Sequence, residues 1–191
     1  METARELFLH ELGDMLDAEN KIVKVLTQQS QESSNSALQN AFRTHLKQSQ
    51  GQISRIQQSF ELLDEETEET ECAGIIGLLE EHDRMTEESP SKDILDVFNV
   101  AAAIKVERYE ISSYESLIRL ADMLGLPDIS KLLKQNLKEE EQTLKKMTTL
   151  TAKVKPETLD SEDEESEIDQ SIRESITHLV RKAGSRRKRV A

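Results

Sequence analysis

Glutamates occupy positions at which the core of a helical bundle should hold apolar side chains. Three segments read as stripes with a spacing of about 3.5 residues, typical of a buried helix face, and each contains a glutamate. The stripes are Phe8, Leu12, Met15, Glu19, Ile22 and Leu26; Val97, Val100, Ile104, Glu107, Ile111, Tyr114 and Ile118; and Ile129, Leu133, Leu137, Glu140, Leu144 and Met147. An unpaired carboxylate in an apolar core is costly, so buried charges are paired or bind metal.

A fourth stripe carries other polar groups on its apolar face. It reads Phe42, His45, Ser49, Gln52 and Ile56. Glu19 and Gln52 are 33 residues apart, and so are Glu107 and Glu140. Equal separations across short turns should place each pair at a similar height. Four helices whose polar groups meet in one layer are the pattern of a carboxylate-bridged metal site in a bundle.

The residue types at these positions favour a metal site rich in oxygen ligands. Two bridged metal ions need about four carboxylates and one or two imidazoles. The predicted ligands are Glu19, His45, Glu107, Glu110 and Glu140, with Gln52 and Tyr114 as supporting hydrogen-bonding groups. Tyr109 is expected to be a further donor beside the carboxylates. Such ligands favour iron, manganese or magnesium over copper, and we predict iron or manganese.

A structural interpretation of the same residues stays open. Charged residues make up 33% of the chain, so a glutamate can fall on an approximate apolar stripe by chance. Drift of the helical period can also turn it to the edge of the bundle, where it pairs with lysine or arginine. His45 would then be a hydrogen-bonded core histidine.

The elements that must position these residues are helices. Glycine (6) and proline (3) are scarce, and tryptophan is absent, a composition that argues against a β-sandwich. The predicted helices span residues 3–31, 37–63, 73–88, 92–124 and 129–152. Thr3 with Glu6 indicates a capping box, residues 33–36 end one helix and cap the next, and Gly125 is a stop before a cap at Asp128.

The connections between the helices predict the topology. Two short turns make two antiparallel hairpins, and a connection of about 30 residues, with an acidic loop at 64–71 and the short helix, joins them. A connection of that length can return the chain along the bundle. We therefore predict an all-α, ferritin-like four-helix bundle with one long crossover containing an extra short helix.

Composition bounds the class of function. The net charge of −13 argues against nucleic-acid binding by the bundle. The single cysteine, Cys72, excludes an internal disulfide and a cysteine-cluster zinc site. The chain has no run of about 20 apolar residues, so we expect no membrane span. No N-terminal apolar run follows a basic stretch, so we expect no signal peptide and a cytoplasmic protein.

The character of the chain changes after Pro156. We expect a bundle at residues 1–152, an acidic linker at 153–170, and an amphipathic tail helix with a basic C-terminus at 171–191. The linker carries acidic residues with no basic residue between 157 and 169, which predicts an extended segment. The tail is either a weakly docked helix or a helix for a protein or anionic partner.

Several motifs give a family resemblance over about residues 5–150. They are Glu6-Leu7-Phe8-Leu9-His10-Glu11-Leu12, Asp14-Met15-Leu16, Ala18-Glu19, Phe42, His45-Leu46, Val106-Glu107-Arg108-Tyr109-Glu110-Ile111, Tyr114, Leu137 and Glu139-Glu140-Glu141. The chain resembles the YciE/YciF family of ferritin-like proteins. The resemblance implies a dimer in the cytoplasm and a link to stress responses. Di-iron bundles use Glu-x-x-His on two helices, whereas this chain has Gln52-Ile53-Ser54-Arg55 and Glu140-Glu141-Gln142-Thr143.

Two functions from different classes remain. The first is a stress-response protein with an internal metal site that could oxidise Fe(II) with oxygen or peroxide. The second is a non-enzymatic helical stress protein with a degenerate site, acting by oligomerisation or partner binding. A third interpretation makes the tail helix the functional part.

Overall fold

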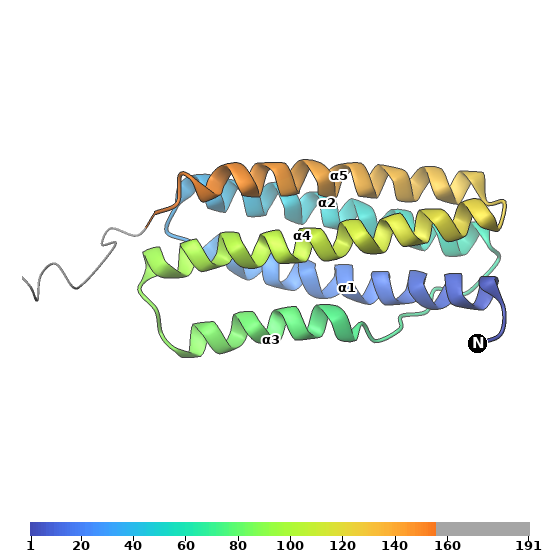
Figure 1. Ribbon diagram of the computed structural model, residues 1–191, viewed down its shortest axis with the longest axis horizontal. Coiled ribbons are helices and arrows are strands. Elements are labelled where there is room, and N and C mark those ends of the chain that lie inside the picture. The colour runs from blue at the N-terminus through green and yellow to red at the C-terminus, as the bar shows by residue number, and fades with distance from the viewer. Residues whose placement is uncertain (156–191) are drawn as a thin grey trace, which may run out of the picture. The chain divides into compact units, whose positions relative to one another are not determined.

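Five α-helices account for most of residues 1–155, the part of the chain that this computed structural model describes (Figure 1). They are α1 (Ala4–Glu32), α2 (Ser36–Leu62), α3 (Ala73–Glu87), α4 (Lys92–Met123) and α5 (Pro127–Thr151). Residues 1–155 contain no strand, and the predicted helix bounds are met to within two residues. The expected tail helix and most of the acidic linker lie outside the described residues.

The predicted helix ends have the expected local chemistry at three of four places. Thr3 and Glu6 form the capping box, and the Asn35 side chain accepts the N–H groups that open α2. Gly125 has φ 70°, and the N–H of Leu126 donates to Ala121 O at 2.9 Å, which closes α4 with a left-handed turn. The predicted cap at Asp128 is wrong, because α5 begins two residues earlier, with Pro127 in its first turn.

The two hairpins are joined as a ferritin-like bundle. α1 runs antiparallel to α2, and α4 runs antiparallel to α5, while the consecutive long helices α2 and α4 run in the same direction (Figure 1). The crossover makes this possible because it carries the chain back along the bundle before α4 starts. The extra helix α3 packs outside the four, against α1 and α4. The predicted fold class is confirmed.

Polar contacts attach the crossover to the bundle. The Asp17 carboxylate accepts the backbone N–H of Cys72 at 2.7 Å, and the Cys72 thiol lies 2.9 Å from the Tyr109 hydroxyl. Gly13 faces the loop before Cys72 so closely that a Cβ would lie 2.7 Å from Glu68 O. Burial works to raise the pKa of Asp17, but its bonds with Cys72 and Lys21 outweigh burial and lower that pKa. Tyr109 therefore serves the crossover, and its hydroxyl donates to Asp14 Oδ2 at 3.3 Å; its prediction as a donor to the glutamates of the apolar stripes is wrong.

The face that α4 buries differs from the predicted stripe at its start. Val97 is 37% exposed, whereas Asp96 and Asn99 are buried. α4 packs on α5, α1 and α3, so apolar side chains are needed around much of its circumference and do not mark one side. From Val100 to Ile118 the predicted stripe lies on the inner side or at its margins. None of the helices within residues 1–155 is long and apolar enough to cross a membrane.

Candidate metal centre

A polar layer crosses the bundle midway along the four long helices. It contains all seven residues predicted from the sequence, and none of them is more than 1% exposed. These are Glu19 of α1, His45 and Gln52 of α2, Glu107, Glu110 and Tyr114 of α4, and Glu140 of α5. The helical period brings them together, because residues three, four or seven apart on one helix share its inner face.

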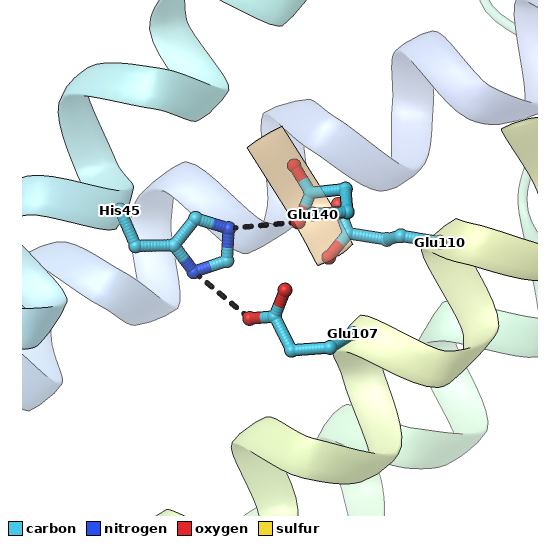
Figure 2. A group of neighbouring side chains, drawn as sticks. All are labelled: His45, Glu107, Glu110 and Glu140. Atoms are coloured by element: carbon cyan, nitrogen blue, oxygen red, sulfur yellow. Dashed lines mark ion pairs between the residues drawn. The ribbon is translucent and has the colours of Figure 1, made fainter. Parts of the chain in front are cut away.

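Four of the seven form a tight group. One ligand atom each from His45, Glu107, Glu110 and Glu140 lies within 4.8 Å of the others (Figure 2). The His45 ring stands between two carboxylates, with Nδ1 3.1 Å from Glu107 Oε1 and Nε2 3.3 Å from Glu140 Oε2. The Gln52 side-chain amide donates to Glu140 Oε1 and holds that carboxylate. We call these four residues the His45 group.

The oxygen atoms of this group are poorly satisfied. Both carboxylate oxygens of Glu107 and of Glu110 are buried without a hydrogen-bond partner among the described residues. The two contacts of His45 have ion-pair distances but lack hydrogen-bond alignment. Most buried polar groups in native proteins have a partner, so these unpartnered oxygens mark the His45 group as a candidate cation site.

The electrostatics of the layer lead to the same conclusion. Burial and then the charge of Glu140 raise the pKa values of Glu19, Glu107 and Glu110 well above their usual range. Burial also acts to raise the pKa of Glu140, but contacts with His45 outweigh it and lower that pKa. Without a cation the layer thus keeps one carboxylate ionised and holds protons on others. A bound metal ion would displace those protons.

Glu19 lies beside the His45 group but is tied into a separate network. Its Oε1 accepts the Tyr114 hydroxyl, which in turn accepts the Asn136 amide at 3.1 Å. Asn136 Oδ1 accepts from the Arg55 guanidinium, which also pairs with Glu139. This Arg55 network ends in the Arg55–Glu139 ion pair at the edge of the layer.

The Arg55 network was not predicted from the sequence. Arg55 stands where di-iron bundles carry the histidine of one Glu-x-x-His motif, so its type was a signal that the site departs from that pattern. Nothing in the sequence joins it to Asn136, 81 residues away. The geometry leaves the His45 group as the better-formed ligand set, with three carboxylates and one imidazole suited to a hard divalent ion.

Comparisons with known proteins agree with the fold. A family described as a domain of unknown function, DUF892, matches residues 3–160. The chain belongs to this family. Its members include proteins similar to this chain over most of their length: protein YciF of Escherichia coli is 38% identical over 151 residues, which cover 78% of this chain and 91% of that protein.

Solved structures extend the match to three dimensions. The E. coli stress protein YciF superimposes with a TM-score of 0.76 at 37% identity, covering 80% of this chain and 96% of that one. YcfI of Rhodopseudomonas palustris, described as a candidate structural protein, gives 0.75 at 37% identity over 78% and 94%. A protein of Xanthomonas campestris gives 0.66 at 16% identity, a likeness of fold alone, over 80% and 93%. The resemblance inferred from the sequence motifs is confirmed.

Proposed function

We propose that this protein binds one Fe(II) or Mn(II) ion per chain in the His45 group. The observation that carries the proposal is the set of buried, unpartnered oxygens of Glu107 and Glu110, which face His45 and Glu140. Glu107, Glu110 and Glu140 would supply oxygen ligands. His45 would bind the ion through one ring nitrogen. Its other ring nitrogen would hold the neighbouring carboxylate, Glu107 beside Nδ1 or Glu140 beside Nε2.

The Arg55 network supports one ion rather than two. A second ion would need Glu19 as a bridging or terminal ligand, but Glu19 Oε1 already accepts the Tyr114 hydroxyl, which leaves only Oε2 as an unpartnered ligand atom. Arg55 also lowers the cost of the Glu19 charge from a distance. The guanidinium, itself paired with Glu139, thus stands on the side of the layer where a second cation would bind.

We further propose that Fe(II) is a substrate and is oxidised in this group by dioxygen. Each Fe(II) loses one electron, and two Fe(II) with one O2 and two protons give two Fe(III) and one hydrogen peroxide. With one ion per chain, the second electron comes from the partner chain of the expected dimer or from the next Fe(II) bound. The carboxylates favour Fe(III) over Fe(II) because they stabilise the higher charge. Removal of free Fe(II) would suit a relative of a stress protein.

The test is anaerobic titration of metal-free protein with Fe(II) and, separately, with Mn(II). We expect one ion per chain, and in Glu140→Gln the affinity should fall by about 100-fold or more, since even supporting groups around metal ligands contribute 10–100-fold. Glu141→Gln is the matched control. It makes the same change one residue away, on an exposed side chain, and should bind within about twofold of wild type.

Two outcomes would change the proposal. Two ions per chain would mean that Glu19 leaves Tyr114 and joins a dinuclear site. No bound iron or manganese at any loading would favour the non-enzymatic alternative, in which the protein acts by oligomerisation or partner binding. Admission of oxygen to the Fe(II)-loaded wild type then tests oxidation, with Glu107→Ala as the variant expected to have lost it.

A further inference from the structure

A small apolar pocket leads from the side of the bundle to the His45 group. It has a volume of about 30 Å³ and lies where α3 covers α1 and α4. Its outer wall is made of half-buried apolar side chains: Val25, Leu78, Leu79, Ala102 and Val106. Its inner wall is buried and includes Ile22, Leu26 and Ala103 together with four polar residues, Gln29, His45, His82 and Glu107.

The size of this pocket limits what it can admit. A water molecule needs roughly 10–15 Å³ of such space, so the pocket has room for one diatomic molecule or two waters. Organic substrates need cavities of about 300 Å³ or more. Only the smallest molecules can therefore reach His45 and Glu107 by this path.

The lining of the pocket selects among these small molecules. Glu107 is its one acidic residue, and no lysine or arginine of the described residues lines it. A hydrated divalent cation would have to shed water against apolar walls, which is costly. Water needs two to four polar partners; the outer wall offers none, and His82 on the inner wall is already bonded to Asn99. A neutral, apolar diatomic molecule has no tightly held hydration water to lose and needs no polar partners.

We infer that this pocket is the binding and entry site for dioxygen, and that Fe(II) reaches the His45 group by another path. The inference rests on the proposed function, because oxygen is the oxidant there, and it adds the place from which the oxidant approaches. Ala103 and Val106 then position the molecule against the face of the group formed by His45 and Glu107. The extra helix α3 acquires a role, since Leu78 and Leu79 close the outer wall.

Xenon tests the pocket without any metal. It is an apolar atom of similar size to dioxygen, and dry apolar cavities bind it. In metal-free wild type under xenon pressure, the methyl NMR signals of Ile22, Ala103 and Val106 should shift in a saturable way. The methyl signal of Ala101, which is exposed on the same helix, should not. Equal small shifts at all four methyl groups would overturn the inference.

A pair of neighbouring variants tests entry. Ala102→Leu places a larger side chain in the outer wall, and Ala101→Leu makes the same change on the exposed side of α4. In Ala102→Leu we expect the oxygen-dependent rate of Fe(II) oxidation to fall by about tenfold, equivalent to 1.36 kcal/mol, with metal affinity within about twofold of wild type. Ala101→Leu should match wild type. Equal rates for the two variants would overturn the inference.

The two proposals fail separately. Saturable xenon binding without iron binding would leave the pocket and remove the metal function. Iron binding and oxidation without xenon binding would leave the function and remove the pocket. If Ala102→Leu melts well below wild type, Ala102→Val repeats the test with a smaller change, and the xenon result needs no variant.

Discussion

Two buried carboxylates on α4 have opposite surroundings. Asp96, 2% exposed, accepts three hydrogen bonds from the α1–α2 turn: from the N–H of Ser34 at 3.0 Å, the hydroxyl of Ser34 at 2.5 Å and the N–H of Asn35 at 2.9 Å. Glu110, fully buried four turns further on, has no hydrogen-bond partner for either oxygen within residues 1–155. Both are acids in a core, but only the first is explained by the chain itself.

The difference distinguishes a buried carboxylate whose hydrogen bonds stabilise the fold from one that the fold leaves without partners. A satisfied carboxylate such as Asp96 stabilises the folded chain, because its three hydrogen bonds compensate the burial of its charge. An unsatisfied one such as Glu110 destabilises the metal-free protein, and the proposed ion would compensate it. The comparison predicts opposite responses to substitution at the two sites.

The largest expected effect is at Asp96. Asp96→Ala removes the charged acceptor of three hydrogen bonds from Ser34 and Asn35, and hydrogen bonds to charged groups contribute about 1.5–3 kcal/mol each, so the free energy of unfolding should fall by about 3 kcal/mol. Urea denaturation measures it. Glu115→Ala, on an exposed part of the same helix, is the control and should change stability by less than about 0.5 kcal/mol. A similar small change in Asp96→Ala would show that the turn is held by other contacts.

The second effect is the pH dependence of the metal-free protein. The pKa values of Glu19, Glu107 and Glu110 are raised in the folded state, relative to an ordinary value of 4.5. The folded state therefore keeps protons that the unfolded state releases, so stability is full below about pH 4.5 and falls as pH rises. Between about pH 5.5 and about pH 7 the fall should be about 2 kcal/mol for one retained proton, given about 1.4 kcal/mol per retained proton and pH unit.

Manganese should remove this pH dependence, because the bound ion displaces the protons in the folded state. Denaturation at both pH values, with and without Mn(II), provides the measurement. A metal-free protein that becomes more stable as pH rises would mean that the layer's carboxylates are ionised and paired by some other cation.

A smaller effect of opposite sign is expected at Glu110. Glu110→Met replaces the unpartnered carboxyl by an apolar group of similar length, and the metal-free protein should gain about 1 kcal/mol at about pH 8. Glu110→Met should also bind Mn(II) more weakly than wild type. Folded Asp96→Ala protein should bind Mn(II) with the affinity of wild type. If Glu110→Met is less stable than wild type, then Glu110 stabilises the fold as Asp96 does, and the two carboxylates do not differ in role.

The smallest effect is expected from removal of the C-terminal segment. Deletion of residues 157–191 keeps all five helices and Val154, which is buried against the bundle. The free energy of unfolding should change by less than about 0.5 kcal/mol, and Mn(II) affinity should be unchanged. A truncated protein that fails to fold would show that the tail belongs to the core, and the proposed division at residue 156 would be wrong.

The fold was predictable because local signals agreed with one another. The turn residues, the capping box at Thr3 and the glycine at Gly125 mark helix ends, and the length of the crossover selects the topology. The buried face in the first turns of α4 was mispredicted, because Val97 is partly exposed there and Asp96 is buried. A helix that packs on three neighbours needs apolar residues on several sides, so hydrophobicity alone does not show which face is innermost.

The candidate site was predictable only in its residue types. Carboxylates on apolar stripes indicate Glu107 and Glu140 without any structure, and a helical turn adds Glu110. The partition of the layer depends on contacts between distant segments. Arg55 contacts Asn136 and Glu139 on another helix, and Asn136 donates to Tyr114, which donates to Glu19. These contacts, which the sequence does not show, tie Glu19 to Tyr114 rather than to the His45 group.

Tyr114 has an optical consequence for the study of the layer. The chain contains two tyrosines and no tryptophan, so its near-ultraviolet absorption and emission come chiefly from Tyr109 and Tyr114. The hydroxyl of Tyr114 donates to Glu19 inside the layer, whereas Tyr109 lies at the crossover beside Cys72. In a Tyr109→Phe variant the remaining tyrosine chromophore would sit next to the carboxylates. The protein would then report a change of charge in its own centre through its spectrum, without an attached dye.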